Sequence, residues 1–241
     1  MIYGDNLLQL STDTYAPNIY AIMQSGNLYA YTMNNLIAHI DPTGFILQIQ
    51  GDEKQKDILF SALKELAGGY RIYMNDKGII SMTNAPKNST PQSRNLIQKL
   101  INSKYTIIIQ ETIQAAKFET GYGADDWGRA ANSKKGSGGT IYMNFTEAGR
   151  IGNTSYGCTD NSPFFICLGH ELIHAERAAR GAYIPSGRTA SESEGMIVYK
   201  ILIEEYATMG LRGYNKKGDI TENMLRAEHG FPLRTRYRTL P

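Results

Sequence analysis

One five-residue motif constrains this chain more than any other feature: residues 170–174 read His-Glu-Leu-Ile-His. The apolar pattern of residues 163–180 predicts that the motif lies on a helix. Because side chains four positions apart stack on one face of a helix, His170 and His174 can bind one zinc ion together. Glu171 is carried beside them and can act as a base on a metal-bound water. The alternative is a pair of surface histidines on an amphipathic helix.

The composition is that of a soluble globular protein, with 41% hydrophobic and 20% charged residues. The 241 residues suffice for one large domain, or for one domain with a short appendage. A net charge of +2 is too small to favour nucleic acid or an anionic membrane as a partner. No apolar run is long enough to span a bilayer, and residues 1–17 lack the pattern of a Sec signal peptide. We therefore expect a monomer with no nucleic-acid or membrane partner.

The two cysteines, Cys158 and Cys167, have neither the number nor the spacing of a disulfide scaffold or a zinc knuckle. Cys167 lies on the predicted helix, where we expect a buried thiol. A single Cys158–Cys167 disulfide is the alternative.

The first 44 residues differ from the rest, because Tyr and Asn are dense and charges are sparse. They end in the turn signature Asp-Pro-Thr-Gly, so we place a domain boundary near Gly44. This divides the chain into an N-terminal segment, residues 1–44, and a second domain, residues 45–241.

Apolar periodicity in the second domain predicts an α+β fold with a twisted, mostly antiparallel sheet above the helix that carries the motif. Strands are predicted over residues 45–50, 70–74, 79–82, 105–110 and 140–145. Helices are predicted over residues 52–66, 93–102, 163–180 and 191–209, and from Asp219 or Thr221 to His229. Asn161 or Ser162 is expected to cap the motif helix, and Ser191 with Glu194 to form a capping box on the next. Residues 134–139 are expected to be mobile, and residues 140–145 to form an edge strand that could pair with an extended peptide.

A catalytic zinc ion has three protein ligands and one open position, so a third ligand must follow the motif. Glu194 lies 20 residues after His174, which is the spacing of thermolysin-like enzymes. The adjacent acids Glu204 and Glu205 lie about 30 residues after it, and one of them could bind zinc while the other holds a ligand histidine. Both possibilities stay open on the residues alone, and two solvated acids on a helix are the structural alternative.

Arg234 and Tyr237 lie three residues apart near the C-terminus. A guanidinium and a phenol from one turn can donate to a single oxygen, which suits the oxyanion formed when water attacks an amide. The alternative is a basic tail that binds an acidic surface. The remaining histidines, His229 and His39, are expected to be structural.

In this order, the motif, a Glu-Glu-x-x-Thr-x-Gly segment at 204–210 and Arg-x-x-Tyr at 234–237 resemble the clostridial neurotoxin light chains. The chain is more similar to the NleD-type effector metalloproteases, which bacteria inject into host cells. The resemblance covers roughly residues 140–237 and implies a zincin-like zinc endopeptidase with Glu205 as the third ligand and Glu204 behind a ligand histidine. It also implies a protein substrate, with MAP kinases of the JNK and p38 type as one candidate.

A second resemblance lies in residues 27–44, which are similar to the end of an Rhs-repeat core. In Rhs and Tc toxins that motif precedes a variable C-terminal toxin domain, although Leu36 stands here in place of the usual proline. The resemblance implies a toxin or effector that is secreted or injected into a target cell.

Two other functions compete with a zinc endopeptidase. A zinc hydrolase of a non-protein amide would have a deep, closed pocket. A non-catalytic module with structural zinc would have a fourth protein ligand in the position of the water.

Overall fold

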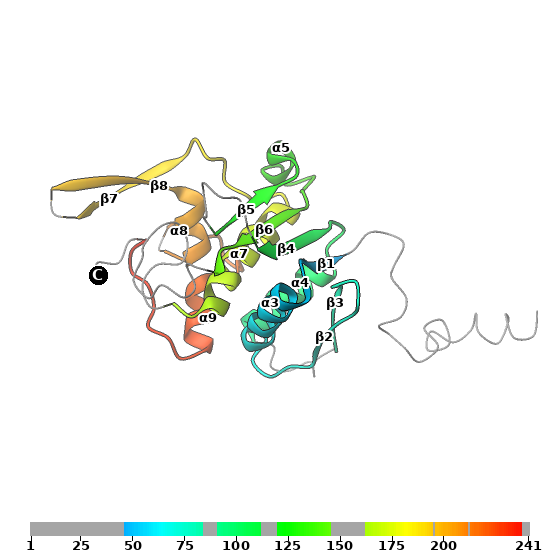
Figure 1. The fold of residues 1–241 in the computed structure, drawn as a ribbon. Coiled ribbons are helices and arrows are strands. Elements are labelled where there is room, and N and C mark those ends of the chain that lie inside the picture. Colours follow the sequence, from blue (N-terminus) through cyan, green and yellow to red (C-terminus); the bar gives the residue numbers. More distant parts are fainter. Residues whose placement is uncertain are drawn as a thin grey trace, which may run out of the picture. The chain divides into compact units, whose positions relative to one another are not determined.

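A four-stranded sheet in the order β1-β4-β6-β5 forms one layer of the fold (Figure 1). The computed structural model describes residues 46–83, 91–111, 120–145, 162–194, 196–211 and 213–237. All of them belong to one of the two units into which the chain divides, Thr43–Pro241. The boundary predicted near Gly44 and the Rhs-like segment lie outside the described residues, as do His39 and Cys158.

The strands of this sheet are short, and their alternate side chains are buried. They are β1 (Leu47–Gln50), β4 (Ile107–Glu111), β5 (Gly121–Ala124) and β6 (Gly139–Met143). Alternation places one row of aliphatic side chains in the core: Leu47, Ile49, Ile107, Ile109, Ile141 and Met143, each at most 1% exposed. Burial of each such side chain is worth about 1.5–3 kcal/mol.

Two expectations about this sheet are wrong. β1 pairs with β4 and β4 with β6 in parallel, and only β5 with β6 is antiparallel, so the sheet is mostly parallel. Helices between β1 and β4 provide the long crossover connection that two parallel neighbouring strands need. The strand near residues 140–145 is interior, because β5, in a Gly-rich stretch without a strand pattern, pairs outside it.

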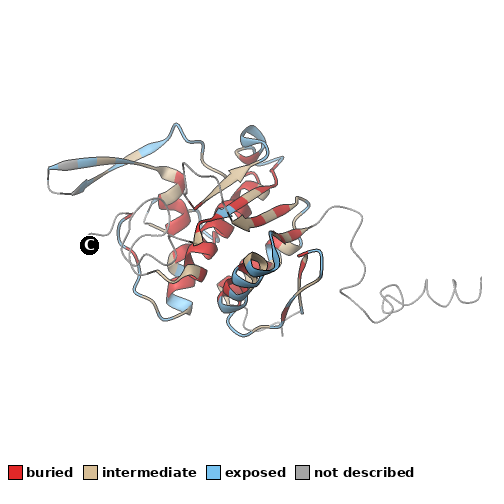
Figure 2. Cartoon of the chain, viewed as in Figure 1, coloured by how far each residue is buried: buried red, intermediate tan, exposed pale blue. Residues whose placement is uncertain are grey.

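Three helices pack beside the sheet. They are α3 (Glu53–Leu66), α4 (Gln92–Ile101) and α7 (Phe164–Ala179), of which α7 carries the motif. Asp52 and Gln55 form a reciprocal capping box at the start of α3, which confirms the predicted helix start. α7 begins at Pro163 without a side-chain cap, so the predicted cap by Asn161 or Ser162 is wrong. Figure 2 shows α7 buried along nearly its whole length.

The strands predicted over residues 70–74 and 79–82 are confirmed as β2 (Ile72–Met74) and β3 (Ile80–Met82), which pair antiparallel as a hairpin. Gly78 has φ +76°, and a Cβ there would lie 2.0 Å from the carbonyl oxygen of Ile49. Only glycine fits this close approach between the turn and β1.

The helix predicted over residues 191–209 is wrong for most of its length. The chain forms the antiparallel strands β7 (Thr189–Glu194) and β8 (Ile197–Leu202), and only then the helix α8 (Ile203–Met209). The β-branched and aromatic residues of β8 favour strand over helix, and the proposed capping box of Ser191 and Glu194 lies within β7. The hairpin projects from the rest of the unit (Figure 1), and Val198 on it is 62% exposed.

The last predicted helix is confirmed as α9 (Glu222–Glu228), with Thr221 as N-cap. Residues 136–139, within the tail expected to be mobile, are buried, and Ser137 N–H donates to Ala178 O at 3.0 Å. Cys167 is disulfide-bonded, so the expected free thiol is wrong. Within the described ranges, no helix has both the length and the apolar character needed to cross a membrane.

Candidate metal centre

The helix α7 places both motif histidines in the interior. It contacts α3, α4, α8 and α9 together with β5 and β6, so every face of the helix is covered. His170 is 1% exposed, and Glu171 and His174 are each 3% exposed. The surface histidine pair considered above is therefore excluded, and two buried imidazoles require polar partners.

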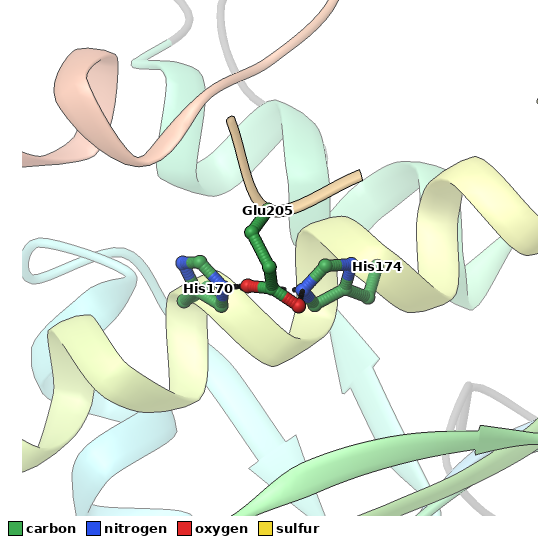
Figure 3. Close-up of side chains that lie close together, drawn as sticks. All are labelled: His170, His174 and Glu205. Atoms are coloured by element: carbon green, nitrogen blue, oxygen red, sulfur yellow. Dashed lines mark hydrogen bonds and ion pairs between the residues drawn. The ribbon is translucent and has the colours of Figure 1, made fainter. Parts of the chain in front are cut away.

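Three side chains converge at this point: His170, His174 and Glu205 (Figure 3). Glu205 Oε2 lies 3.0 Å from His170 Nε2, and Glu205 Oε1 lies 3.4 Å from His174 Nε2. The two Nε2 atoms are 3.1 Å apart. Tetrahedral zinc with bonds of about 2.0–2.1 Å places its ligand atoms about 3.3 Å apart. The three side chains therefore fit a zinc ion in both chemistry and spacing.

Carboxylates hold both rings from behind. Glu222 Oε2 lies 2.7 Å from His170 Nδ1, and Glu204 Oε1 lies 3.3 Å from His174 Nδ1. A carboxylate at Nδ1 favours the tautomer with its proton there, which leaves the Nε2 lone pair for a metal. Glu204 therefore lies on the Nδ1 side of His174, whereas Glu205 lies at Nε2 of both rings.

Arginines neutralise these supporting carboxylates. Arg177 Nε donates to Glu204 Oε1 at 2.7 Å, and Arg226 Nε donates to Glu222 Oε1 at 2.5 Å. Arg177 Nη1 also donates to Asp219 Oδ2 at 2.8 Å. The charges behind the histidines are therefore paired, which reduces the cost of burying them.

The electrostatics favour charged carboxylates next to the imidazoles. Burial lowers the pKa of His170, but hydrogen bonds to Glu205 and Glu222 outweigh it and raise that pKa to about 9. Burial raises the pKa of Glu205, but the charge of His174 and hydrogen bonds to both histidines hold it well below its ordinary value. The pKa of Glu171 is raised, because the effect of burial is larger than the opposing effect of the charges on His174 and His170.

Arg234 and Tyr237 lie beside the support of His170. Arg234 is 5% exposed, its Nη1 donates to Glu222 Oε2 at 3.4 Å, and its Nη2 donates to the carbonyl oxygen of Tyr237. The Tyr237 ring packs against Tyr206 of α8 with 6.4 Å between ring centroids. The structure thus links Arg234 to the centre through Glu222.

The candidate acid Glu194 and the remaining described histidine, His229, belong to other elements than α7 and α8. Glu194 ends strand β7, and the group that can hold a metal among the described residues contains Glu205. His229 Nε2 lies 3.1 Å from Leu66 O and 3.3 Å from Ser93 Oγ, which fits the structural role expected for it.

Sequence reasoning assigned no role to Glu222, Arg177 or Tyr183. The Tyr183 ring lies 6.0 Å from the His174 ring and 4.9 Å from that of Trp127. Burial, and then the charges of Glu204 and Glu205, raise its pKa. Glu222 belongs to a segment that resembles the NleD-type family, but its local pattern, an acid at a helix start with Arg226 four residues later, also describes an exposed ion pair.

A family model described as effector protein, Peptidase_M91, matches residues 85–237. This match covers more than half of the chain. The chain belongs to the peptidase M91 family of effector proteins. Membership confirms the expectation of an effector protease, whose substrate is a protein, and it suggests delivery into host cells. No curated protein and no solved structure matches the chain.

Proposed function

We propose that this M91 peptidase is a zincin-like, zinc-dependent endopeptidase. The observation that carries the proposal is the convergence of His170, His174 and Glu205, whose ligand atoms all lie within 4.8 Å of one another. Among the described residues this group has three members, the number found in catalytic zinc sites with an open position for water. A structural zinc module would need a fourth.

Each residue then has a distinct task. His170, His174 and Glu205 hold the ion, and Glu222 and Glu204 orient the two imidazoles. When bound, zinc would act as a Lewis acid toward water and the scissile carbonyl.

Glu171 is the proposed general base. It accepts a proton from the attacking water and passes it to the departing amine, so one carboxylate serves both steps. Its buried position supports this role, because burial raises the pKa of the carboxylate and so makes it a stronger base than an exposed glutamate.

Arg234 and Tyr237 are the proposed donors to the oxyanion of the tetrahedral intermediate. Arg234 Nε is a buried donor with no hydrogen-bond partner in the described part of the chain. The guanidinium therefore keeps its Nε–H free, besides the donors that it gives to Glu222 and Tyr237.

The test compares wild-type protein with Glu171→Gln and His174→Ala. We expect Glu171→Gln to keep bound zinc and lose proteolysis, and His174→Ala to lose both, with zinc measured by mass spectrometry of the purified proteins. N-terminal proteomics on a treated eukaryotic lysate would reveal new termini with wild type alone, and termini inside a kinase activation loop would support the candidate substrate class. Zinc-free His174→Ala protein that still cuts would refute the mechanism.

A further inference from the structure

A pocket of about 640 Å³ lies beside the candidate metal centre, in the segment that joins α7 to β7. Tyr183, Ile184 and Arg188 line it from this segment, Ile203 from the start of α8, and Lys216 from the loop that precedes α9. The cavity is large enough for a side chain or a small ligand.

The same segments reach the metal centre. Ile184 N–H donates to Glu204 Oε2 at 2.8 Å, and the Tyr183 ring lies 6.0 Å from that of His174. Ile203 directly precedes Glu204 and Glu205 in the chain. The pocket and the centre therefore share residues 183–184 and the start of α8.

The pocket is positively charged. Arg188 and Lys216 line it and are exposed, and none of its described lining residues is acidic. Neither cation forms an ion pair within the described ranges.

Two carboxylates that contact the segments around the pocket, those of Asp219 and Glu204, already accept hydrogen bonds from other groups. Asp219 accepts from Arg177, Arg180 and the backbone N–H of Lys216. Glu204 is held by Arg177 and by the N–H of Ile184. These carboxylates therefore do not neutralise the pocket, and Arg188 keeps its planar donor array free for a bidentate anion.

We propose that this pocket is a subsite for an anionic side chain of the protein substrate, held by Arg188 and Lys216. The inference rests on the proposed endopeptidase function and adds a substrate preference to it. The anion is either the carboxylate of Asp or Glu or the phosphate of a phosphorylated residue, since a guanidinium and an ammonium bind both.

The first experiment digests a proteome-derived peptide library with wild-type protein and with the double variant Arg188→Gln/Lys216→Gln. We expect wild type to favour an acidic residue at one fixed position relative to the cut. The ratio of kcat/KM for an acidic peptide over its amide counterpart should fall roughly tenfold or more in the double variant. Phosphatase treatment of the library separates the two sources, because it removes a preference for phosphate and spares one for carboxylate.

The matched controls are Lys217→Gln and Arg71→Gln, exposed cations outside the pocket lining, which should keep the wild-type preference. An apolar preference at every position, or an acidic preference unchanged in the double variant, would overturn the proposal.

A second measurement separates this inference from the proposed function. Inorganic phosphate is titrated into zinc-loaded Glu171→Gln protein, with and without the Arg188→Gln/Lys216→Gln substitutions. The ring of Trp127, the single tryptophan, packs against that of the pocket residue Tyr183 with 4.9 Å between centroids, so its fluorescence reports binding. We expect a saturable change that the two pocket substitutions abolish. If wild type cuts nothing and this change is still seen, the endopeptidase proposal fails while the anion pocket stands; equal phosphate binding with and without the substitutions refutes the pocket.

Discussion

Glu222 holds the ring of His170, and Glu222→Gln tests whether the centre is built to bind a metal. The carboxylate lies 2.7 Å from His170 Nδ1 and also accepts from Arg226 and Arg234. Glutamine keeps the size and one carbonyl oxygen but loses the charge. Removing a carboxylate behind a ligand histidine typically lowers metal affinity 10–100-fold, or about 1.4–2.7 kcal/mol. We expect the zinc dissociation constant to rise by that factor.

The substitution also leaves two buried guanidiniums without their counter-charge, and loss of one partner of a buried ion pair costs about 3–5 kcal/mol. We expect a smaller loss in unfolding free energy, because the glutamine oxygen still accepts a hydrogen bond. Denaturant unfolding with a chelator present measures this effect apart from zinc binding.

Chelator competition at pH 7 measures zinc affinity in wild type, Glu222→Gln and the control Glu228→Gln. Glu228 is an exposed acid at the other end of α9, so its replacement should leave zinc affinity unchanged. Folded Glu222→Gln protein with wild-type zinc affinity would refute the claim that Glu222 orients a ligand.

The pKa of metal-free His170 is about 9 and that of His174 is also raised, so zinc binding at pH 7 should release protons. Zinc affinity should then rise with pH by up to about tenfold per pH unit for each proton released. Calorimetry in buffers of different ionisation enthalpy measures this release, and heats independent of buffer would contradict it. Tyr237→Phe should lower kcat on the order of 100-fold and KM little, and an unchanged kcat would remove Tyr237 from the oxyanion role. Gly181→Ala should lower the unfolding free energy by about 1–3 kcal/mol, because φ at Gly181 is +72° and the new Cβ would lie 1.9 Å from Asn132 O. The control Gly187→Ala should change the unfolding free energy little, because a Cβ at Gly187 meets no atom within 4 Å. Equal melting temperatures for both glycine variants would show that Gly181 carries no such constraint.

The parts of the fold that sequence predicted are those with local causes. The capping box at Asp52 starts α3, and the turn at Gly78 sets the register of β2 with β3. Strand order and direction have no such local cause. β5 carries no alternating apolar pattern, so its place at the sheet edge depends on pairing with β6 across the chain.

The residues of the candidate site also differ in whether local sequence or contacts across the chain bring them together. His170 and His174 are brought together by helix spacing, which the sequence contains in full. Glu205 came from the order of motifs and from family resemblance. Glu222 could not be found, because its contact with His170 spans 52 residues and requires α9 to pack on α7.

The change from strand to helix at Leu202 explains how two adjacent acids reach two different partners. On a helix, successive side chains diverge by about 100°, so Glu205 can face the two Nε2 atoms while Glu204 faces His174 Nδ1 and Arg177. Both acids also lie in the first turn of α8, where the helix macrodipole favours negative charge. A continuous helix over residues 191–209 would have placed them near its C-terminal end, where the dipole opposes them. The hairpin that interrupts the predicted helix therefore places the glutamate pair at a helix start, where the dipole favours the charge of the candidate ligand and of its neighbour.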